Sequence, residues 1–152
     1  MTASTTIDAA PDTVFAVLAD PAAHEAIDGT GWVRAPIDGS TLDHEGQVFR
    51  MAMYHENHPA KDYEMANRVE VFDPPRAIAW LPGQASDTGE LDFGGWTWRY
   101  DLAADGPSRT VVTLTYDWSA VPPQVREFIS FPPFGKDHLD NSLRHLADLA
   151  AG

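Results

Sequence analysis

Alternation of apolar and polar residues through the middle of the chain restricts the fold more than any other feature of the sequence. It is clearest over Tyr63–Phe72, where the apolar Met65, Val69 and Val71 take turns with charged residues. Neighbouring side chains of a strand point to opposite faces, so this pattern predicts a strand with one buried and one solvated face. Strands are also predicted over Ser4–Asp8, which is rich in β-branched residues, and over Arg76–Leu81, which is short and apolar. Further strands are predicted over Trp32–Ile37, Val48–His55, Gly95–Ala103 and Thr110–Trp118, with clear alternation in the last two. Six or seven antiparallel strands with one apolar face need a cover.

Helical signals flank this region on both sides. Pro11 and the Asp20–Pro21 pair predict the starts of two short helices after the first strand, because proline suits a first turn and aspartate caps one. Lys136–Ala151 reads as an uninterrupted amphipathic helix with one leucine stripe. It is the one segment long enough to cover the sheet. Between the strands, Pro82–Gly83 is expected to end the strand before it, and Ser86–Gly95 to form an acidic loop.

These elements predict an α+β fold in which a curved antiparallel sheet wraps round the long C-terminal helix. Two short helices follow the first strand. The chain has 152 residues, which favours one domain over residues 1–152. A sheet curved round a single helix leaves room between them, and such folds commonly hold a ligand there.

Short motifs along the whole chain add a family resemblance. They are Ile7–Phe15, Leu18–Pro21 with His24, Ile27–Gly29, Asn67–Val69, Pro75–Trp80, Tyr116–Trp118, and Phe131–Phe134 followed by Leu139 and Ser142–Leu143. With this order of elements, the sequence resembles the START-like (SRPBCC) helix-grip superfamily, which includes polyketide cyclases/dehydrases and lipid-transfer domains. The resemblance implies the helix-grip fold and a polyketide-like, lipid-like or isoprenoid-like ligand. Members of the superfamily differ in activity, so it does not imply one reaction.

Charge and composition exclude several kinds of partner. Asp and Glu total 23 against 10 Lys and Arg, a net charge of −13. Nucleic acid and anionic membrane surfaces both require basic patches, so neither is expected as a partner. The chain has no cysteine, which excludes disulfides and thiolate catalysis and fits a cytoplasmic location. No apolar run is long enough to span a bilayer, and no secretory signal is present. The sequence leaves the oligomeric state open.

Aromatic and methionine side chains are the main candidates for binding a ligand. Strand alternation places most of them on the inward face, where they would either line a pocket or fill the core. The candidates are Trp80, Trp96, Trp98, Tyr100, Trp118, Met51, Met53 and Met65. His138 joins them if it leans inward from the last helix. The spacing of His138 and His145 favours two exposed histidines instead.

Four polar residues are the candidates for chemistry. Strand alternation places Tyr63 and Tyr116 on the inner face, where each can donate a hydrogen bond to a carbonyl, although each also suits core packing. Asn67 also points inward, where a buried amide must bond protein, water or ligand. His55 is placed to act as a base at the mouth of a cavity, or is a solvated loop residue.

Other chemistry has less support in the sequence. Arg50, Arg68 and Arg99 fall on the outward face, which argues against polarisation of a ketone by arginine. The His55–His58 segment lacks the spacing of a metal motif, so no metal is expected. No phosphate-binding loop, dinucleotide fingerprint or serine elbow is present, and no cofactor is expected.

Together these features predict a domain that binds a small hydrophobic or aromatic ligand in an internal cavity. Catalysis would take the form of cofactor-free cyclisation or dehydration. The first alternative is a non-catalytic carrier or sensor with the same pocket. The second is a protein-interaction module of the chaperone-activator type, which would display an exposed apolar patch.

Overall fold

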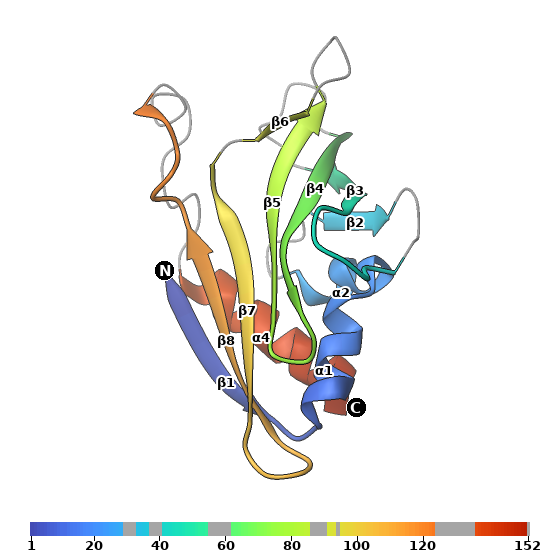
Figure 1. Ribbon diagram of the computed structural model, residues 1–152, viewed down its shortest axis with the longest axis vertical. Helices are drawn as coiled ribbons and strands as arrows, with labels where there is room; N and C mark the ends of the chain where they lie inside the picture. Colours follow the sequence, from blue (N-terminus) through green and yellow to red (C-terminus); the bar gives the residue numbers. More distant parts are fainter. Residues whose placement is uncertain are drawn as a thin grey trace.

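The computed structural model of the chain describes residues 1–28, 33–36, 41–54, 62–85, 91–93, 95–123 and 136–151. In chain order its elements are β1 (Thr2–Ile7), α1 (Pro11–Leu18), η1 (Pro21–Ala23), α2 (His24–Ile27), β2 (Val33–Pro36), β3 (Val48–Tyr54), β4 (Asp62–Asp73), β5 (Ala77–Ala85), β6 (Leu91–Phe93), β7 (Thr97–Ala104), β8 (Thr110–Asp117) and α4 (Lys136–Ala151) (Figure 1). The predicted order is confirmed, and α4 has the bounds expected from the sequence.

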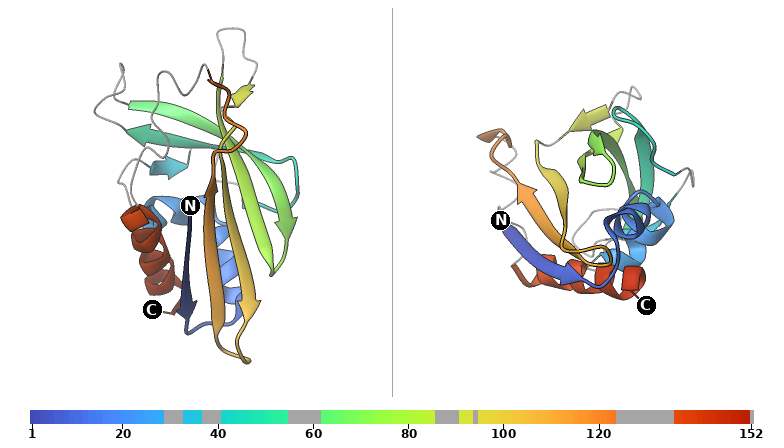
Figure 2. Two further views of the ribbon diagram at one scale, coloured as in Figure 1. Left: turned by 90° about the vertical axis from the view of Figure 1, so that its left-hand side faces the viewer. Right: turned by 60° about the horizontal axis from the view of Figure 1, so that its bottom comes forward.

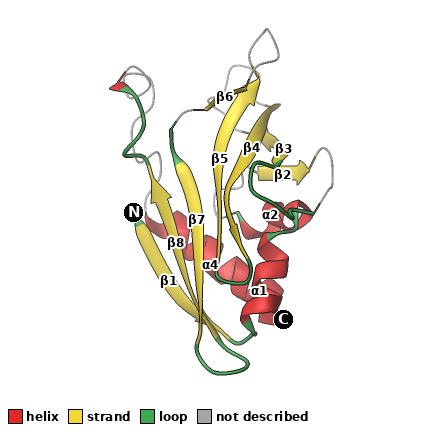
Figure 3. Ribbon diagram, in the orientation of Figure 1, coloured by secondary structure: helices red, strands yellow, loops and turns green. Residues whose placement is uncertain are grey.

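One antiparallel sheet contains all the described strands. Its order is β1-β8-β7-β5-β4-β3-β2, and the short β6 pairs with β5 beside this path. β1 and β2 therefore lie at opposite edges, and the segment α1–η1–α2 carries the chain from one edge to the other. The sheet curls, and the helices lie on its concave side (Figures 2 and 3). This is the predicted helix-grip arrangement.

The short helices begin where the sequence predicts. Pro11 is the first residue of α1, and Asp12 lies in its first turn, where an acid suits the helix dipole. Asp20 caps η1, because its Oδ1 accepts a hydrogen bond of 3.0 Å from the Ala22 amide. The second predicted helix begins as a 3₁₀ turn and continues as α2, so these residues form two short elements in succession.

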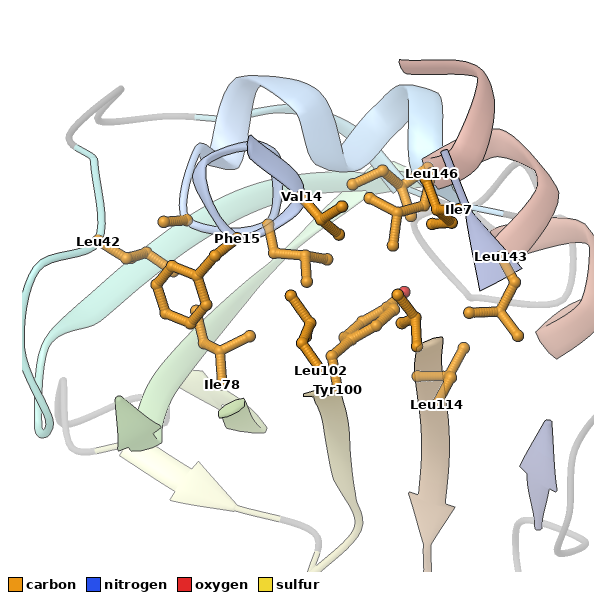
Figure 4. Packing of buried hydrophobic residues seen from close by; sticks show 14 of the residues in the cluster. Ile7, Val14, Phe15, Leu42, Ile78, Tyr100, Leu102, Leu114, Leu143 and Leu146 are labelled. Atoms are coloured by element: carbon orange, nitrogen blue, oxygen red, sulfur yellow. The ribbon is translucent and has the colours of Figure 1, made fainter. Parts of the chain in front are cut away.

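The leucine stripe of α4 closes the core. Leu139, Leu143 and Leu146 are all buried, and the helix packs against β1, α1 and α2. Figure 4 shows Leu143 and Leu146 beside Ile7 of β1 and Val14 of α1. Burying several such side chains, each worth about 1.5–3 kcal/mol, explains why this helix rather than a loop covers the sheet.

Two predictions about the middle of the sheet were wrong. β5 does not end before Pro82 and Gly83 but continues through both to Ala85. Pro82 lies where β5 changes its neighbour from β7 to β6, so the ladder on that side is already interrupted and the missing N–H is tolerated. Part of the expected acidic loop is the strand β6, which pairs with β5 at Gly83–Ala85.

The alternation in β4 also changes along the strand. The pairing of β4 with β5 shifts register between Val69 and Val71. Beyond this irregularity Phe72, rather than Val71, packs on the core, with its ring 5.4 Å from that of Phe15. A bulge inserts one residue into a strand and so reverses the parity of those that follow.

Among the described helices, none has the length and apolar character needed to cross a membrane.

Candidate functional site

The inner face of the sheet changes in character along β5, β7 and β8. Facing pairs along these strands are Leu102–Val112, Tyr100–Leu114, Trp98–Tyr116, Ile78–Tyr100 and Trp80–Trp98. The aliphatic members are buried, and Ile78, Val112 and Leu114 are fully so. Trp80 and Trp98 are only half-buried, although they pack against the same core. Tryptophan surface on the inner face is therefore accessible at one end of the sheet, which we call the aromatic end.

Rings make contact with one another across the aromatic end. Trp80 stacks on Tyr100 with ring centroids 5.9 Å apart, and Trp98 lies 4.5 Å from Tyr116. Trp118, just beyond β8, lies 5.6 Å from Tyr116. Figure 4 shows Tyr100 among Leu102, Leu114 and Leu143, where the aromatic residues meet the aliphatic core. Such a wall suits a flat or apolar molecule through burial of area and ring stacking.

His24 adds a buried imidazole to this wall. Its ring stacks on Trp80 at 5.0 Å and meets the edge of Phe49 at 5.5 Å. Its Nε2 lies 2.8 Å from the Leu18 carbonyl oxygen, which can only accept, so Nε2 carries a proton and donates it. Burial lowers the pKa of His24 below its ordinary range, against the smaller opposing effects of Leu18 and Asp20. The imidazole is therefore neutral near neutral pH.

Asn67 is buried on β4, as its inward position in the strand alternation predicts. It faces Phe49 of β3, and its Nδ2 donates to the Phe49 carbonyl oxygen over 3.4 Å. This distance exceeds the usual 2.7–3.2 Å or so for an N–H to oxygen bond, so the hydrogen bond is weak. Asn67 places an amide beside the ring of Phe49, which in turn contacts Trp80 at 5.9 Å.

A carboxylate and an imidazole meet between the helices. Asp28 follows α2, and one of its oxygens accepts a hydrogen bond of 3.0 Å from the Val33 amide at the start of β2. The other oxygen lies 4.0 Å from Nε2 of His138 on α4, and both side chains are only 8% exposed. The His138 ring also meets Trp98 edge-on at 5.4 Å. The pair therefore adjoins the aromatic end.

Asp28 also acts on two tyrosines of the sheet. Burial, reinforced by the Asp28 charge, raises the pKa of Tyr100 and the pKa of Tyr63. Burial alone raises the pKa of Tyr116. All three hydroxyls therefore stay protonated near neutral pH and keep their ability to donate a hydrogen bond.

The methionine candidates lie beside Tyr63 on β3 and β4. Met53 faces Tyr63 across the two strands, and Met51 faces Met65. Met51 is buried in the core, whereas Met53, Met65 and Tyr63 are half-buried. Met53 also faces Val33, whose amide binds Asp28, and methionine adapts readily to the shape of what it contacts.

The structure brings many of the predicted site residues together but not all of them. With His24, the predicted residues form two groups of contacting rings, one of His24, Trp80 and Tyr100 and one of Trp98, Tyr116, Trp118 and His138. The facing pair Trp80–Trp98 places the two groups on neighbouring strands. Trp96 is half-buried just before β7. His55 lies outside the described residues, as does the rest of the His55–His58 segment. Among the residues that are described, no group of three potential metal ligands occurs.

The expectation of two exposed histidines on the last helix was wrong. His138 is buried against Trp98, and His145 is half-buried with its Nδ1 donating to the Ile27 carbonyl oxygen over 3.2 Å. Ser142, one turn after His138, is buried as well. The buried face of α4 is therefore wider than its leucine stripe, because α2 packs on the flank that carries the histidines.

The outward positions of the arginines are confirmed. Arg50 and Arg99 are exposed, and Arg99 bonds both carboxylate oxygens of Asp101 at 3.0 Å. Arg68 is half-buried and pairs with Glu70 at 2.8 Å. None of the three is placed to polarise a ketone at the aromatic end.

Sequence reasoning missed Asp28 and His24 as members of the site. Both residues stood in family motifs, His24 beside Leu18–Pro21 and Asp28 within Ile27–Gly29, without a role in the site. One local signal was available for Asp28: a carboxylate after the last turn of a helix opposes the helix dipole, so its presence there needs another reason. Its proximity to α4 could be found only from the packing.

Comparison with known proteins tests the family resemblance. A family model described as polyketide cyclase/dehydrase and lipid transport matches residues 1–151, which confirms the resemblance drawn from the motifs. An uncharacterised protein of Mycobacterium tuberculosis, Rv0088, is 29% identical over 107 residues, or 70% of this chain and 42% of that protein. The chain thus spans less than half the length of this relative.

Solved structures share the fold at low sequence identity. Protein CV1439 of Chromobacterium violaceum has a TM-score of 0.63 and 16% identity, covering 100% of this chain and 96% of its own. A point mutant of Thalictrum norcoclaurine synthase, in complex with a transition-state analogue, has a TM-score of 0.64 and 13% identity, covering 99% and 92%. At these identities the likeness extends to the fold alone.

Proposed function

We propose that this chain, which belongs to the polyketide cyclase/dehydrase and lipid transport family, binds a small hydrophobic or aromatic ligand between the aromatic end of its sheet and α4. The observation that carries the proposal is the difference in burial along one inner face. Ile78 and Leu114 are fully buried, whereas Trp80 and Trp98 keep accessible surface. Side chains that served only to fill a core would be packed to the density seen at the aliphatic end.

Polar groups at the aromatic end would orient such a ligand. The hydroxyls of Tyr63 and Tyr116 are protonated donors, and Asn67 adds an amide beside Phe49. Groups of this kind would also support cofactor-free acid–base chemistry, such as cyclisation or dehydration of a bound chain, with His55 as a further candidate. A carrier or sensor would use the same pocket without changing the ligand.

A protein-interaction role has less support. Such a module would present an exposed apolar patch. Among the residues that the structure describes, the large apolar side chain that is exposed is Leu149, which is 42% accessible. One leucine beside the short helices is too small a patch to favour docking of a protein over binding of a small molecule.

The test is to identify what the protein binds. The protein would be purified from its own host, examined by native mass spectrometry, and then denatured so that any released small molecule can be identified. A bound hydrophobic molecule supports the proposal, and returning it to the stripped protein separates a carrier from an enzyme by whether the molecule changes. If the protein carries nothing and calorimetry detects no binding of hydrophobic probes, the proposal fails.

Variants then test the individual residues. We expect Tyr116→Phe, Asn67→Ala and His55→Ala to lower turnover or affinity, with the exposed Arg99→Gln as the matched control. If the first three variants all retain full turnover and affinity on the identified molecule, the assignment of these residues is wrong, whereas the pocket itself would stand.

A further inference from the structure

His24 has two ring nitrogens, and the fold accounts for one of them. Nε2 donates a hydrogen bond of 2.8 Å to the carbonyl oxygen of Leu18. Leu18 is the last residue of α1, and the carbonyls of a last helical turn have no partner within their own helix. The imidazole therefore satisfies the end of α1 through Nε2. This structural role needs nothing from Nδ1, the second nitrogen.

Nδ1 carries a lone pair that the neighbouring rings cannot use. The proton of the neutral imidazole is on Nε2, so Nδ1 can only accept a hydrogen bond. Phe49, whose ring centroid is 5.5 Å away, has no donor. Trp80 stacks with 21° between the ring planes, so its N–H does not point along a lone pair that lies in the imidazole plane. In the described part of the chain, no donor bonds Nδ1.

This acceptor lies in the wall of the proposed pocket. His24 is 7% exposed, and it stacks at 5.0 Å on Trp80, which keeps accessible surface on the inner face. Burial lowers the pKa of His24, so the lone pair is available near neutral pH. Polar atoms of buried side chains are normally hydrogen-bonded. A ligand that binds against Trp80 therefore meets an imidazole held in place by Leu18, whose Nδ1 still lacks a donor.

We propose that His24 determines the specificity of the pocket: its Nδ1 accepts a hydrogen bond from a hydroxyl or N–H group of the bound aromatic or apolar molecule. The inference rests on the proposed ligand-binding function and deepens it, because it names the polar group that the ligand carries. A molecule of the same shape without a donor would leave the acceptor unpaired. Sites built to bond a hydroxyl or N–H group discriminate strongly against analogues that lack it.

Three uncharged probes with one ring system test this requirement. Naphthol, methylnaphthalene and methoxynaphthalene carry their group at the same ring position. Methylnaphthalene replaces the hydroxyl by a group of similar size, and methoxynaphthalene keeps the oxygen without the donor. Burial of apolar area alone favours methylnaphthalene over naphthol. We expect isothermal titration calorimetry on the full chain to give the opposite order, with naphthol at least about tenfold tighter than either of the others.

Nitrogen NMR on protein with labelled histidine reports on Nδ1 directly. The unprotonated nitrogen of a neutral imidazole gives a signal separate from that of the protonated one, and accepting a hydrogen bond shifts it. We expect saturating naphthol to shift the Nδ1 signal of His24, and methylnaphthalene to shift it much less. A histidine that only satisfied the end of α1 would not distinguish the two probes.

A pair of matched variants assigns the preference to His24. His24→Phe keeps a flat ring beside Trp80 but removes the acceptor, so the preference for naphthol over methylnaphthalene should fall by about tenfold. His145→Phe is the control, because His145 also bonds a backbone carbonyl, that of Ile27 at 3.2 Å, and is half-buried on α4. Equal changes of preference in the two variants would overturn the inference.

The outcomes separate this inference from the proposed function. Binding of all three probes with similar affinity, tightest binding of methylnaphthalene, or an Nδ1 signal that naphthol does not move overturns the role of His24 and leaves the hydrophobic pocket standing. Failure of every probe to bind overturns both. If His24→Phe does not fold, the ranking of the probes and the NMR signal of the unaltered protein still decide.

Discussion

The two ends of the sheet interior are built from the same strands but from different kinds of residue. At the aliphatic end, β5, β7 and β8 carry Ile78, Leu102, Val112 and Leu114, which are all buried. At the aromatic end, the same strands and the helix α4 carry tryptophan, tyrosine and histidine, with Trp80 and Trp98 half-buried. The helix α4 follows the change, from His138 at its start to Leu146 near its end. The aliphatic end therefore contributes packing, and the aromatic end is where we propose that a ligand binds.

The largest expected effect is a loss of stability from a cavity at the aliphatic end. Leu143→Ala should lower the free energy of unfolding by about 2–5 kcal/mol, because it leaves a cavity among fully packed neighbours. Urea denaturation would measure this loss. The control is Leu149→Ala on the same helix, which should change stability by no more than about 0.5 kcal/mol because Leu149 is 42% exposed. Similar losses from both variants would contradict the assignment of stability to this end.

The next largest expected effect concerns Trp98 at the aromatic end. Trp98→Leu should weaken naphthol binding by about tenfold, because it removes ring surface beside Tyr116 and His138. Its cost in unfolding free energy should stay below that of Leu143→Ala, because Trp98 is only half-buried. Calorimetry and urea denaturation give the two values. A large loss of stability with unchanged affinity would make Trp98 a core residue like those at the aliphatic end.

A smaller effect concerns pH, because the aromatic end buries an ionisable group. The pKa of His24 is lowered by burial, so below about pH 6.5 the unfolded chain binds a proton that the folded chain does not. Stability is therefore fully present above that pH and falls as the pH falls. Between about pH 7.5 and about pH 5.5, the wild type should lose about 1 kcal/mol more unfolding free energy than His24→Gln.

Urea denaturation across this pH range provides the measurement. The exposed Arg99 offers the control variant Arg99→Gln, whose pH dependence should follow the wild type because an arginine does not titrate in this range. If the His24→Gln profile is as steep as that of the wild type, the loss at low pH arises elsewhere, and His24 is not held neutral by the fold.

The parts of this comparison that depend on local pattern could be predicted from the sequence. Alternation along a strand depends only on neighbouring residues, so it placed Tyr100 and Trp98 on the inner face and Arg99 on the outer one. The long helix had a continuous stripe and no internal proline, so its bounds were also predictable. β6 was missed because its three residues form a strand only through pairing with β5, which propensity along the chain does not reveal.

The candidate site was less predictable, because it is assembled between elements far apart in the chain. Asp28 lies close to His138 only because α2 packs on α4. The pattern of apolar residues within either segment does not predict that contact. The inward turn of His138 likewise depends on Trp98 from a third element. The bulge in β4 is a further case: it moved Phe72 to the inner face in place of Val71, and a one-residue shift of this kind leaves little trace in the alternation.

The smallest expected effect tests whether the two faces of one strand are independent. Arg99 lies between Trp98 and Tyr100 in sequence but on the outer face, where its exposed ion pair with Asp101 is worth about 0–1 kcal/mol. Arg99→Gln should therefore change the unfolding free energy by less than about 1 kcal/mol and leave naphthol affinity unaltered. An affinity loss comparable to that of Trp98→Leu would show that the outer face supports the ligand site through the strand itself. Unchanged affinity would confine recognition to the inner face, where the aromatic and aliphatic ends differ.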